Sequence, residues 1–434
     1  MTESAETALA EVFGAEWPLL IGAAMRIVGD LQTAEDVVQE TVLTALDRWP
    51  LQGVPDRPGA WLMTACRNRA RNAVRDNGRA RRAIASMTRE AAASAAAGPA
   101  YPEQGADHDE IGDDRLRLIV LCCHPALSAD AQVALTLRMV CGLTTEEIAR
   151  GCHLPTTAVA QRIVRAKRVL REHEAVFLAD EPDVRARLPA ILDVIYLVFN
   201  EGYLAAAGET LSRGDLAFEA CRLARLVTDV IADEPETWAL RALIAFQLSR
   251  SATRTAGDGS VLTLDQQDRS KWNRELITDG VRALSRARVG GPGPLLLQAE
   301  LAACHSTAAT FDATDWHAIV AIYDRLQRVQ DTPVVAMNRA VAVAMRDGPA
   351  AALPLLDRLA EDAALKGSHR VWAVRADLHR RLGDRVAATA DYQRALRLVS
   401  NQAERRYLEC ALRQVPGAAA RTGITREAEH DAAG

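Results

Sequence analysis

TTEEIARGCHLPTTAVAQRIVRAKRVLR, residues 144–171, decides the fold, because its residue order predicts two short helices joined by a tight turn. Thr144 and Glu147 have the spacing of a capping box, in which each side chain bonds the other residue's backbone amide and a helix begins. A glycine and then Pro155 end that helix, since proline keeps its predecessor out of the helical region. A second helix begins at Thr156 or its neighbour. The pattern predicts a helix-turn-helix.

The second predicted helix is amphipathic and basic. Its apolar residues recur every three or four positions, which gives one buried stripe. They are Val159, Ile163, Ala166 and Leu170. The remaining side chains are mostly cationic, so the helix can contact base edges in the major groove while its arginines bond phosphates. The alternative is a solvated basic helix, but the capped helix and short turn before it favour a recognition helix.

A second basic stretch lies upstream, between Trp61 and Arg82, where Asp76 is the sole acid. Its cations are Arg67, Arg69, Arg71, Arg75, Arg79, Arg81 and Arg82. The loop before it, residues 50–59, is too rich in proline and glycine to be predicted as helix. Aromatic rings beside arginine and asparagine suit single-stranded DNA, whose bases stack on π faces. In the alternative interpretation, Trp61 belongs to the core and the arginines form a solvated face.

An acidic helix is predicted ahead of both, within residues 29–46 and starting near Thr33. Glu35 and Asp36 are favoured there by the helix dipole. Its buried stripe consists of Val37, Val38, Thr41, Val42 and Ala45. Because an acidic face repels DNA, we expect a protein surface as its partner, with a solvated face as the alternative.

Three blocks of the chain carry a family resemblance. They are Ala34-Glu35-Asp36-Val37-Val38-Gln39-Glu40, then Ala60-Trp61-Leu62 with Arg67-Asn68, then Glu147-Ile148-Ala149 with Val159, Arg162, Arg165 and Ala166. In this order they resemble the extracytoplasmic-function sigma factors of bacterial RNA polymerase. The resemblance spans roughly residues 20 to 175.

The resemblance implies two polymerase contacts and two promoter contacts. The acidic block would bind the clamp helices of the largest polymerase subunit through Glu35, Asp36, Gln39 and Glu40. The flap of the second largest subunit is a further implied partner. The minus ten element would be bound and melted by Trp61, Arg67, Asn68, Arg71, Asn72 and Arg75. The minus thirty-five element would be bound by Thr156, Thr157, Gln161, Arg162, Arg165 and Arg168.

Two positions depart from the usual family pattern. Ala160-Gln161 stand where Lys-Ser is usual, and Asn72 stands where Asp is common. The promoter sequence therefore cannot be carried over from the family, although Gln161 could bond adenine through both the oxygen and the nitrogen of its side-chain amide.

The expected organisation is all-α, with two small sigma domains, a linker and a longer helical domain. The boundaries are a sigma-2 domain at 10–85, a flexible linker at 86–110, a sigma-4 domain at 111–175, a tetratricopeptide-like domain at 180–415 and a disordered tail at 416–434. The linker is rich in Ala, Gly and Pro. Such a tether can span tens of ångströms, which lets the two modules bind separate promoter elements.

The chain beyond residue 180 predicts helices throughout, because strand-like alternation is absent. The predicted helices are 188–199, 216–231, 236–248, 268–287, 294–304, 316–329, 333–346, 349–360, 369–381 and 385–399. A tetratricopeptide pattern appears at Trp372, Ala376, Gly383, Ala388, Tyr392 and Ala395, with Gly348 thirty-five residues before Gly383. Pro354 is expected to kink its helix or delay its start. Stacked helix pairs leave a concave surface for a protein or peptide partner.

Two further motifs resemble an unusual sigma subgroup that has a long helical C-terminal extension. They are Cys122-Cys123-His124-Pro125 and the run from Leu197 to Tyr203 that contains Phe-Asn-Glu-Gly-Tyr. This resemblance implies that the attached domain regulates the sigma factor in place of a membrane-bound anti-sigma factor.

Composition predicts a cytoplasmic chain without membrane contact. The 434 residues carry a net charge of -5, the N-terminus has no basic n-region, and no stretch of eighteen apolar residues occurs. The net charge disfavours nucleic-acid binding, whereas the clustering of cations favours it. The eight cysteines lack the paired spacing of a zinc site, so we expect buried thiols, no metal and no cofactor.

Enzymatic function is not expected, because a phosphate loop, a nucleophile elbow and an HExxH motif are all missing. A sigma factor controlled by its C-terminal repeats accounts for all the blocks. The main alternative is a stand-alone helix-turn-helix regulator whose repeats sense a ligand or partner, and it leaves the acidic helix and the Trp61 cluster without a role. A scaffold protein, the third class, leaves the helix-turn-helix unexplained.

Overall fold

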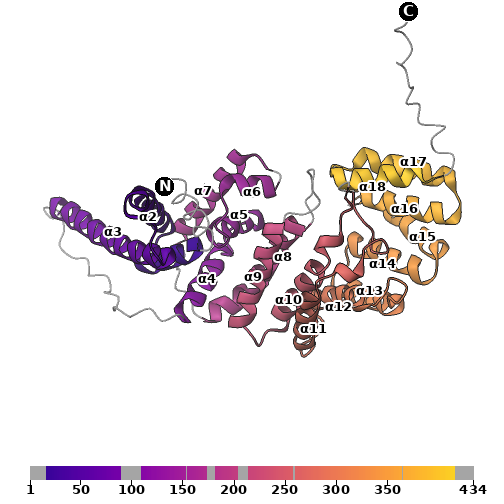
Figure 1. Ribbon diagram of the computed structural model, residues 1–434, viewed down its shortest axis with the longest axis horizontal. Coiled ribbons are helices and arrows are strands. Elements are labelled where there is room, and N and C mark those ends of the chain that lie inside the picture. The colour runs from indigo at the N-terminus through magenta and orange to yellow at the C-terminus, as the bar shows by residue number, and fades with distance from the viewer. Residues whose placement is uncertain are drawn as a thin grey trace, which may run out of the picture. The chain divides into compact units, whose positions relative to one another are not determined.

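Figure 1 shows a computed structural model of the chain. It describes residues 16–88, 109–152, 154–173, 181–203, 214–257, 260–363 and 365–415. Within these ranges the regular elements are helices, with a single isolated β-bridge and no strand, which confirms the all-α prediction. Most of the expected linker, 89–108, and the expected tail lie outside the described residues. The chain forms two compact units.

The first unit comprises Met1–Phe199 and Arg222–Ile231. Its helices are a helix at 16–28, α2 (Leu31–Gln52), α3 (Pro58–Thr88), α4 (Asp109–Cys122), α5 (Ala129–Met139), α6 (Thr145–Gly151), α7 (Thr156–Glu172), and parts of α8 (Glu181–Tyr203) and α9 (Gly214–Val230). α2 packs against α3, and α7 packs against both α5 and α6. The first unit therefore extends beyond residue 180, where the sequence places the start of the C-terminal domain.

The helix-turn-helix forms as its local sequence predicts. Thr144 Oγ1 accepts a bond of 3.2 Å from the Glu147 amide, and Glu147 Oε2 accepts one of 2.7 Å from the Thr144 amide. This confirms the capping box at the start of α6. The apolar stripe of α7 is also confirmed, since each of its members is buried. They are Val159, Ile163, Ala166 and Leu170.

The proline-rich stretch before Trp61 is more helical than predicted. α2 continues through Pro50 to Gln52, and α3 begins at Pro58. A proline at the first helical position has no amide that needs a partner, so Pro58 is compatible with a helix start. Pro50 lies in the last turn of α2, where the loss of one backbone bond is tolerated.

The second unit comprises Asn200–Cys221 and Ala232–Gly434. Its further helices are α10 (Pro235–Leu248), η1 (Ser251–Thr253), η2 (Arg269–Lys271), α11 (Arg274–Ala287), α12 (Pro294–Thr307), α13 (Trp316–Val329), α14 (Pro333–Arg346), α15 (Pro349–Ala360), α16 (His369–Leu382), α17 (Arg385–Leu398) and α18 (Gln402–Arg413). Each α-helix from α10 to α18 packs against the next one, as Figure 1 shows for the orange and yellow part of the chain.

The tetratricopeptide-like pattern is confirmed in this unit. Ala376, Ala388 and Ala395 are fully buried where α16 and α17 cross. Gly348 and Gly383, at the turns within the last two helix pairs, have φ of 92° and 83°, which glycine adopts without strain. α15 runs from Pro349 to Ala360 as predicted, so of the two effects expected of Pro354, a kink or a delayed start, the delay does not occur.

The predicted helix over residues 268–287 begins too early. Residues 269–271 form the 3-10 turn η2, and α11 begins at Arg274. Asn273 caps α11, because its side-chain oxygen accepts bonds from the amides of Glu275 and Leu276 at 3.0 and 3.1 Å. Asp268 instead bonds the Ser270 amide at 3.0 Å. Two side-chain acceptors thus compete for this segment, and the later one starts the α-helix.

A recurrent ion pair links the helices of the second unit. The seventh residue of α10, α12, α14 and α16 is charged and contacts an opposite charge on an adjacent helix. The pairs are Arg241–Asp279 (2.7 Å), Glu300–Arg325 (3.1 Å), Arg339–Asp324 (2.6 Å) and Arg375–Asp357 (3.2 Å). The same helix position thus carries an ion pair to a neighbouring helix in all four cases. The partner lies on the following helix for α10 and α12 and on the preceding helix for α14 and α16.

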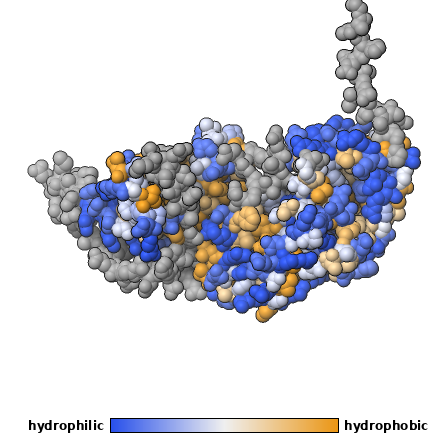
Figure 2. All heavy atoms as spheres, viewed as in Figure 1, coloured by the Kyte–Doolittle hydropathy of each residue, from blue (hydrophilic) through white to orange (hydrophobic). Residues whose placement is uncertain are grey.

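Figure 2 shows a largely hydrophilic surface over the C-terminal repeats, with single apolar residues scattered across it. Val386, Leu382 and Leu398 are among those exposed. Among the described residues, none of the helices combines the length and the apolar character needed to cross a membrane.

Candidate nucleic-acid and polymerase interface

One side of α7 carries most of the side chains predicted to bind the minus thirty-five element. Val164, 65% exposed, lies on this side and was missed by the sequence analysis. It could have been found by helical periodicity, because it lies opposite the apolar stripe and suits contact with a thymine methyl group. The exposed face of α7 consists of Thr156, Thr157, Gln161, Val164, Arg165 and Arg168.

Arg162 lies apart from this exposed face. It is half-buried, and its Nη2 lies 3.2 Å from Oδ2 of Asp130 on α5. The ion pair connects α7 to the helix beneath it. Arg162 therefore has a partner within the protein, and its contact with the minus thirty-five element stays a prediction.

Three of the four residues predicted to bind the polymerase form one face of α2. Asp36, Gln39 and Glu40 are exposed, and Leu43, 59% exposed, continues their row one turn later. We call Asp36, Gln39, Glu40 and Leu43 the acidic face of α2. Gln32 Nε2 donates to Asp36 Oδ1 at 3.1 Å, which orients that carboxylate along the helix.

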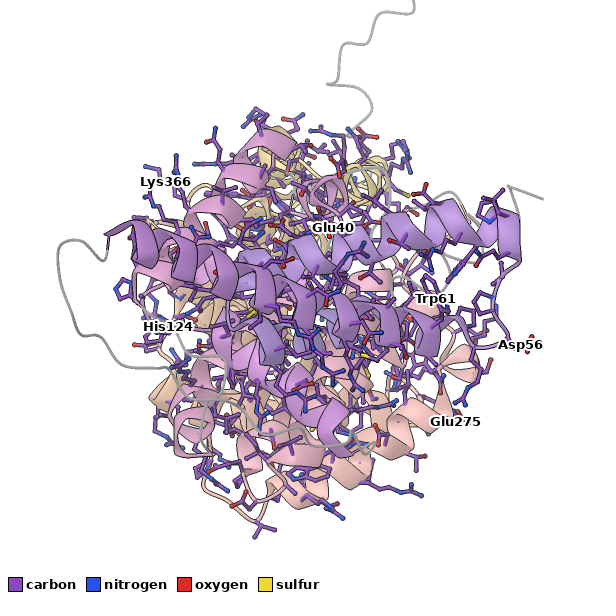
Figure 3. All side chains as sticks on the ribbon, turned by 90° about the vertical axis from the view of Figure 1, so that its left-hand side faces the viewer. Glu40, Asp56, Trp61, His124, Glu275 and Lys366 are labelled. Atoms are coloured by element: carbon purple, nitrogen blue, oxygen red, sulfur yellow. The ribbon has the colours of Figure 1, made fainter. Side chains whose placement is uncertain are left out.

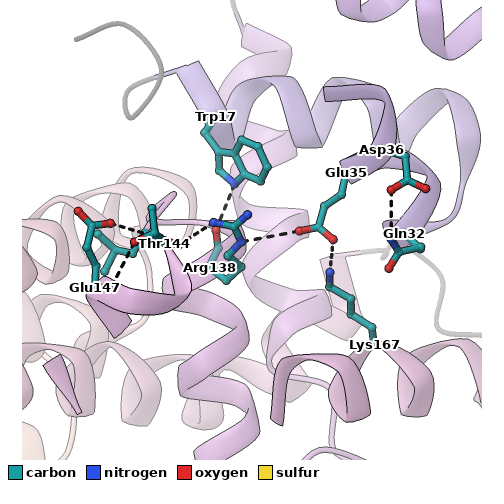
Figure 4. Close-up of polar contacts among 9 residues, drawn as sticks. Trp17, Gln32, Glu35, Asp36, Arg138, Thr144, Glu147 and Lys167 are labelled. Atoms are coloured by element: carbon teal, nitrogen blue, oxygen red, sulfur yellow. Dashed lines mark hydrogen bonds and ion pairs between the residues drawn. The ribbon is translucent and has the colours of Figure 1, made fainter. Parts of the chain in front are cut away.

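Glu35, the fourth residue, lies elsewhere. It is 3% exposed and its carboxylate contacts Lys167 of α7 and Arg138 of α5, as Figure 4 shows. Arg138 Nε lies 3.8 Å from Glu35 Oε1. The side chains of Glu35 and Asp36 thus have separate surroundings although the residues are neighbours in the sequence.

The basic helix α3 places its aromatic residue against the core. The rings of Trp61 and Trp49 meet edge to face with their centroids 5.7 Å apart. Trp49 is buried, whereas Trp61 is half-buried, so part of its ring is accessible. Figure 3 labels Trp61 on α3 and Glu40 on α2. Both sequence interpretations of Trp61, as a core residue and as a stacking surface, are compatible with this position.

The polar residues of α3 vary in exposure. Asn68, Arg71, Asn72 and Arg75 are exposed, and Arg67 is half-buried. The side chains of Arg79, Arg81 and Arg82 lie outside the described residues.

Arg69, which the site prediction leaves out, connects α3 to α2. Its Nε lies 2.9 Å from Glu40 Oε2, and its Nη1 donates at 3.0 Å to the Glu40 carbonyl and to Thr44 Oγ1. Sequence spacing carries no signal for this contact, because the partners lie on different helices. It fixes the acidic face of α2 against the basic helix.

The first unit also contains buried cysteines, among them Cys66, Cys122 and Cys123. Burial raises the pKa of Cys66 and of Cys123 to about 12, and it raises the pKa of Cys122 well above its usual range. Such thiols are protonated at neutral pH and poor nucleophiles or ligands. Among the residues that the structure describes, no group of three or more His, Cys, Asp or Glu is placed to hold a metal ion.

Comparison with protein families gives three matches along the chain. Residues 13–80 match sigma-70 region 2, residues 117–170 match sigma-70 region 4, and residues 187–288 match a family of unknown function, DUF6596.

Two curated relatives match at different extents. An uncharacterized protein of Rhizobium meliloti (strain 1021) is 38% identical over 397 residues, which are 91% of this chain and 93% of that protein. The ECF RNA polymerase sigma factor SigL of Mycobacterium tuberculosis (strain H37Rv) is 32% identical over 149 residues, which are 34% of this chain and 78% of that protein. Comparison with solved structures gives no match.

Proposed function

Because this chain belongs to the extracytoplasmic-function sigma factors of the sigma-70 family, we propose that it directs a bacterial RNA polymerase core to specific promoters under the control of its C-terminal helical unit. The observation that carries the proposal is the pair of exposed faces in the first unit. One is the acidic face of α2, and the other is the exposed face of α7.

The acidic face of α2 is proposed to bind the clamp helices of the largest polymerase subunit. Carboxylates at Asp36 and Glu40 flank a polar Gln39, and Leu43 adds apolar area at the end of the row. An exposed face that mixes charge with an apolar residue fits a protein surface better than it fits DNA. The flap of the second largest subunit is proposed as a contact of region 4.

The basic helix α3 is proposed to hold the melted minus ten element. Asn68, Arg71, Asn72 and Arg75 present donors to phosphates and base edges, and the accessible part of Trp61 offers a stacking surface. The exposed face of α7 is proposed to bind the minus thirty-five element in the major groove. There Gln161 and Val164 would contact bases, while Arg165 and Arg168 would bond phosphates.

Control by the C-terminal unit is proposed from the way in which the chain leaves the first unit. Arg187 of α8 donates to the Val120 carbonyl at 3.1 Å, and Arg222 of α9 donates to the Val140 carbonyl at 3.4 Å. The helices α8 and α9, which lead into the repeats, are therefore hydrogen-bonded to the unit that carries the proposed DNA-binding faces. A partner that binds the repeats could act on region 4 through α8 and α9.

Run-off transcription tests the sigma-factor function. The reaction would contain core polymerase, the full chain and supercoiled DNA from upstream of its own operon, and we expect defined transcripts that require both proteins. Asp36→Arg should abolish them, because the reversed charge faces the polymerase. Glu361→Arg, at an exposed acid of the second unit, is the matched control and should leave them intact. Transcripts that persist with Asp36→Arg would refute the docking role, and duplex binding without transcription would favour the stand-alone regulator.

A second comparison tests the regulation. A chain that ends at Ile231 retains every part of the first unit. If the repeats restrain or support the sigma factor, this chain should give a different transcript yield from the full chain at equal concentration. Equal yields across a range of concentrations would argue against control by the second unit.

A further inference from the structure

The insertion between α10 and α11, residues 249–273, contains an arginine that uses only one edge of its guanidinium. Nη1 of Arg269 donates to the carbonyls of His305 and Ala308 at 2.6 and 2.9 Å, at the C-terminal end of α12. The guanidinium carbon lies over the Trp272 ring, 4.5 Å from its centroid. Nε and Nη2 share the other edge, and both are buried without a hydrogen-bond partner in the described part of the chain.

The unpaired edge of Arg269 has the geometry of an oxyanion site. Nε and Nη2 of an arginine point the same way and can bond two oxygens of one carboxylate or phosphate. Buried donors without a partner are rare, because a group that loses water without gaining a bond is unfavourable. Nδ1 of His305 is also buried without a partner among the described residues. Because Arg269 contacts the carbonyl of that same histidine, the three nitrogens belong to one place.

A second arginine lies within electrostatic reach of this place. Burial and the charge of Arg250 lower the pKa of Arg269, and burial with the charges of both arginines lowers the pKa of His305 to about 4. Two hydrogen bonds explain the proximity. The Thr253 amide donates to the Arg250 carbonyl at 3.1 Å, and Thr253 Oγ1 accepts the ring N–H of Trp272 at 2.9 Å. The ring on which Arg269 stacks is therefore held one turn from Arg250.

None of the carboxylates in the described residues forms an ion pair with Arg250 or Arg269. Arg250 bonds the side-chain amide of Gln247, and Arg269 bonds two carbonyls. The neighbouring acid, Asp268, is exposed and pairs with Lys271 at 3.5 Å. Like charges that lie together repel each other unless an opposite charge offsets them. An anion would reduce this repulsion and satisfy the unpaired nitrogens.

A third arginine of the insertion, Arg254, has partners of its own. Its Nη1 donates to the Tyr203 carbonyl at 2.6 Å, and its guanidinium lies 3.8 Å from the Tyr203 ring centroid. The charge of Glu404 also acts on it. Arg254 therefore adds positive charge near Arg250 while its own donors are directed elsewhere.

We propose that Arg250, Arg269 and His305 form a phosphate-binding site, which we call the oxyanion site. Two oxygens of the phosphate group would accept bonds from Nε and Nη2 of Arg269. Arg250 would offset the second negative charge, and Nδ1 of His305 would donate to a third oxygen. The group can be free phosphate or part of a phosphorylated small molecule, because the same three side chains would bind either one.

The two permanent charges of the oxyanion site favour a phosphate over a carboxylate. A phosphate group carries about two negative charges near neutral pH, whereas a carboxylate carries one and would leave one arginine unbalanced. The binding side chains come from α10, the insertion and α12, so a bound ligand would stabilise the contacts among these elements. The inference does not depend on the proposed sigma-factor function, because the oxyanion site lies wholly within the second unit.

Isothermal titration calorimetry of the full chain with inorganic phosphate tests the oxyanion site. At constant ionic strength and near neutral pH we expect saturable binding at a single site. Arg250→Gln should weaken it at least about tenfold, because a charge-assisted contact is lost. Arg250→Lys keeps the charge and should restore much of the affinity. Arg282→Gln, at an exposed arginine of α11, is the matched control and should leave the affinity unchanged.

A second reading follows the pKa of His305, which ligand would not change if Arg250 had only a structural role. A bound anion offsets the charges of both arginines, so it should raise this pKa from about 4 toward its ordinary value. Sulfate is the probe, because it has the shape of phosphate and keeps its charge across this pH range. Carbon-13 NMR of labelled histidine rings measures the pKa, and His305→Phe identifies the signal. An unchanged pKa at sulfate concentrations that displace phosphate would contradict the proposal.

Pyrophosphate in place of inorganic phosphate distinguishes the two sources of the ligand. Tighter pyrophosphate binding assigns a phosphorylated small molecule to the oxyanion site, and weaker binding assigns free phosphate. Acetate that binds as tightly as phosphate would overturn the choice of phosphate. A lack of saturable binding, or equal affinities of Arg250→Gln and the wild type, would overturn the site itself. The helical spectra and melting temperatures of the variants without ligand separate lost binding from lost folding.

Discussion

Adjacent residues of this chain take unrelated roles because a helix turns by about 100° per residue. Glu35 and Asp36 follow one another in an acidic motif, yet Glu35 is buried between two cations and Asp36 is exposed. The same holds for Lys167 and Arg168 on α7. A sequence motif that is transferred from a family as one unit therefore does not show which of its residues are buried and which are exposed.

Thiol reactivity is the first prediction at the residue scale. Cys410 is exposed, whereas Cys66, Cys122 and Cys123 are buried with a raised pKa. We expect Cys410 to react fastest with a thiol reagent in the native chain, and the three buried thiols to react only after unfolding. Timed labelling followed by peptide mass spectrometry measures this. Rapid labelling of Cys122 or Cys123 would contradict it.

A pH dependence is the second residue-scale prediction. Burial, with the nearby charges of Arg250 and Arg269, lowers the pKa of His305 from 6.5 to about 4. The unfolded chain thus binds a proton that the folded chain does not, so stability falls as pH drops from about 6.5 toward 4. Between about pH 7 and about pH 5 the loss from this group is about 2 kcal/mol.

Urea unfolding of the full chain at those two pH values measures this loss. His305→Phe keeps a ring against Trp316, whose centroid lies 5.5 Å away, and should flatten the dependence. An equal loss in the wild type and in this variant would show that other groups cause it.

The third prediction concerns one element, the first helix of the helix-turn-helix. Thr144→Ala removes a side-chain cap of α6 and should cost about 1 kcal/mol of unfolding free energy. It should also weaken duplex binding, since α6 supports α7. Thr145→Ala, one position inside the helix, is the matched control and should change neither. Chemical denaturation and a duplex-binding titration report both effects, and identical curves for the two variants would contradict the cap.

The fourth prediction concerns the junction of two elements in the second unit. The Glu236 carboxylate on α10 accepts bonds from the amides of Leu295 and Leu296 at 3.1 and 3.2 Å and so caps α12. A Cβ on Gly293 would lie 2.3 Å from that carboxylate. Gly293→Ala should therefore displace the cap and cost about 1 kcal/mol.

A double-mutant cycle tests the junction. The cost of Gly293→Ala should largely vanish in a Glu236→Ala background, because the cap is already lost. Gly291→Ala has open space around its Cβ and serves as the control. Additive costs would show that the two residues act independently.

The fifth prediction belongs to the whole molecule and concerns where the first unit ends. Buried residues of α8, among them Leu188, Ile191 and Phe199, pack within that unit. A chain that ends at Ile231 should melt cooperatively, whereas one that ends at residue 180 should melt at a lower temperature because it lacks this packing. Circular dichroism melts of both chains provide the measurement. Equal melting temperatures would show that α8 and α9 contribute nothing to the unit.

Local sequence was sufficient for much of the fold. Helical periodicity, caps and turn residues act between neighbours within four positions, so α6, α7 and the exact limits of α13, α14 and α15 could be predicted. The predicted helix limits were wrong where two capping side chains competed, as at Asp268 and Asn273, and where a proline lies at the end of a helix.

The sequence by itself also determined the family and the order of its regions, because motifs and their spacing can be recognised without knowledge of the contacts between residues. Only the tertiary structure decided that Glu35 is buried against Lys167 and Arg138, that Arg69 pairs with Glu40, and that the first unit includes α8. The physical reason is distance along the chain: Glu35 and Lys167 are 132 residues apart. Neither periodicity nor local charge carries information about which side chains folding will bring together over such a separation.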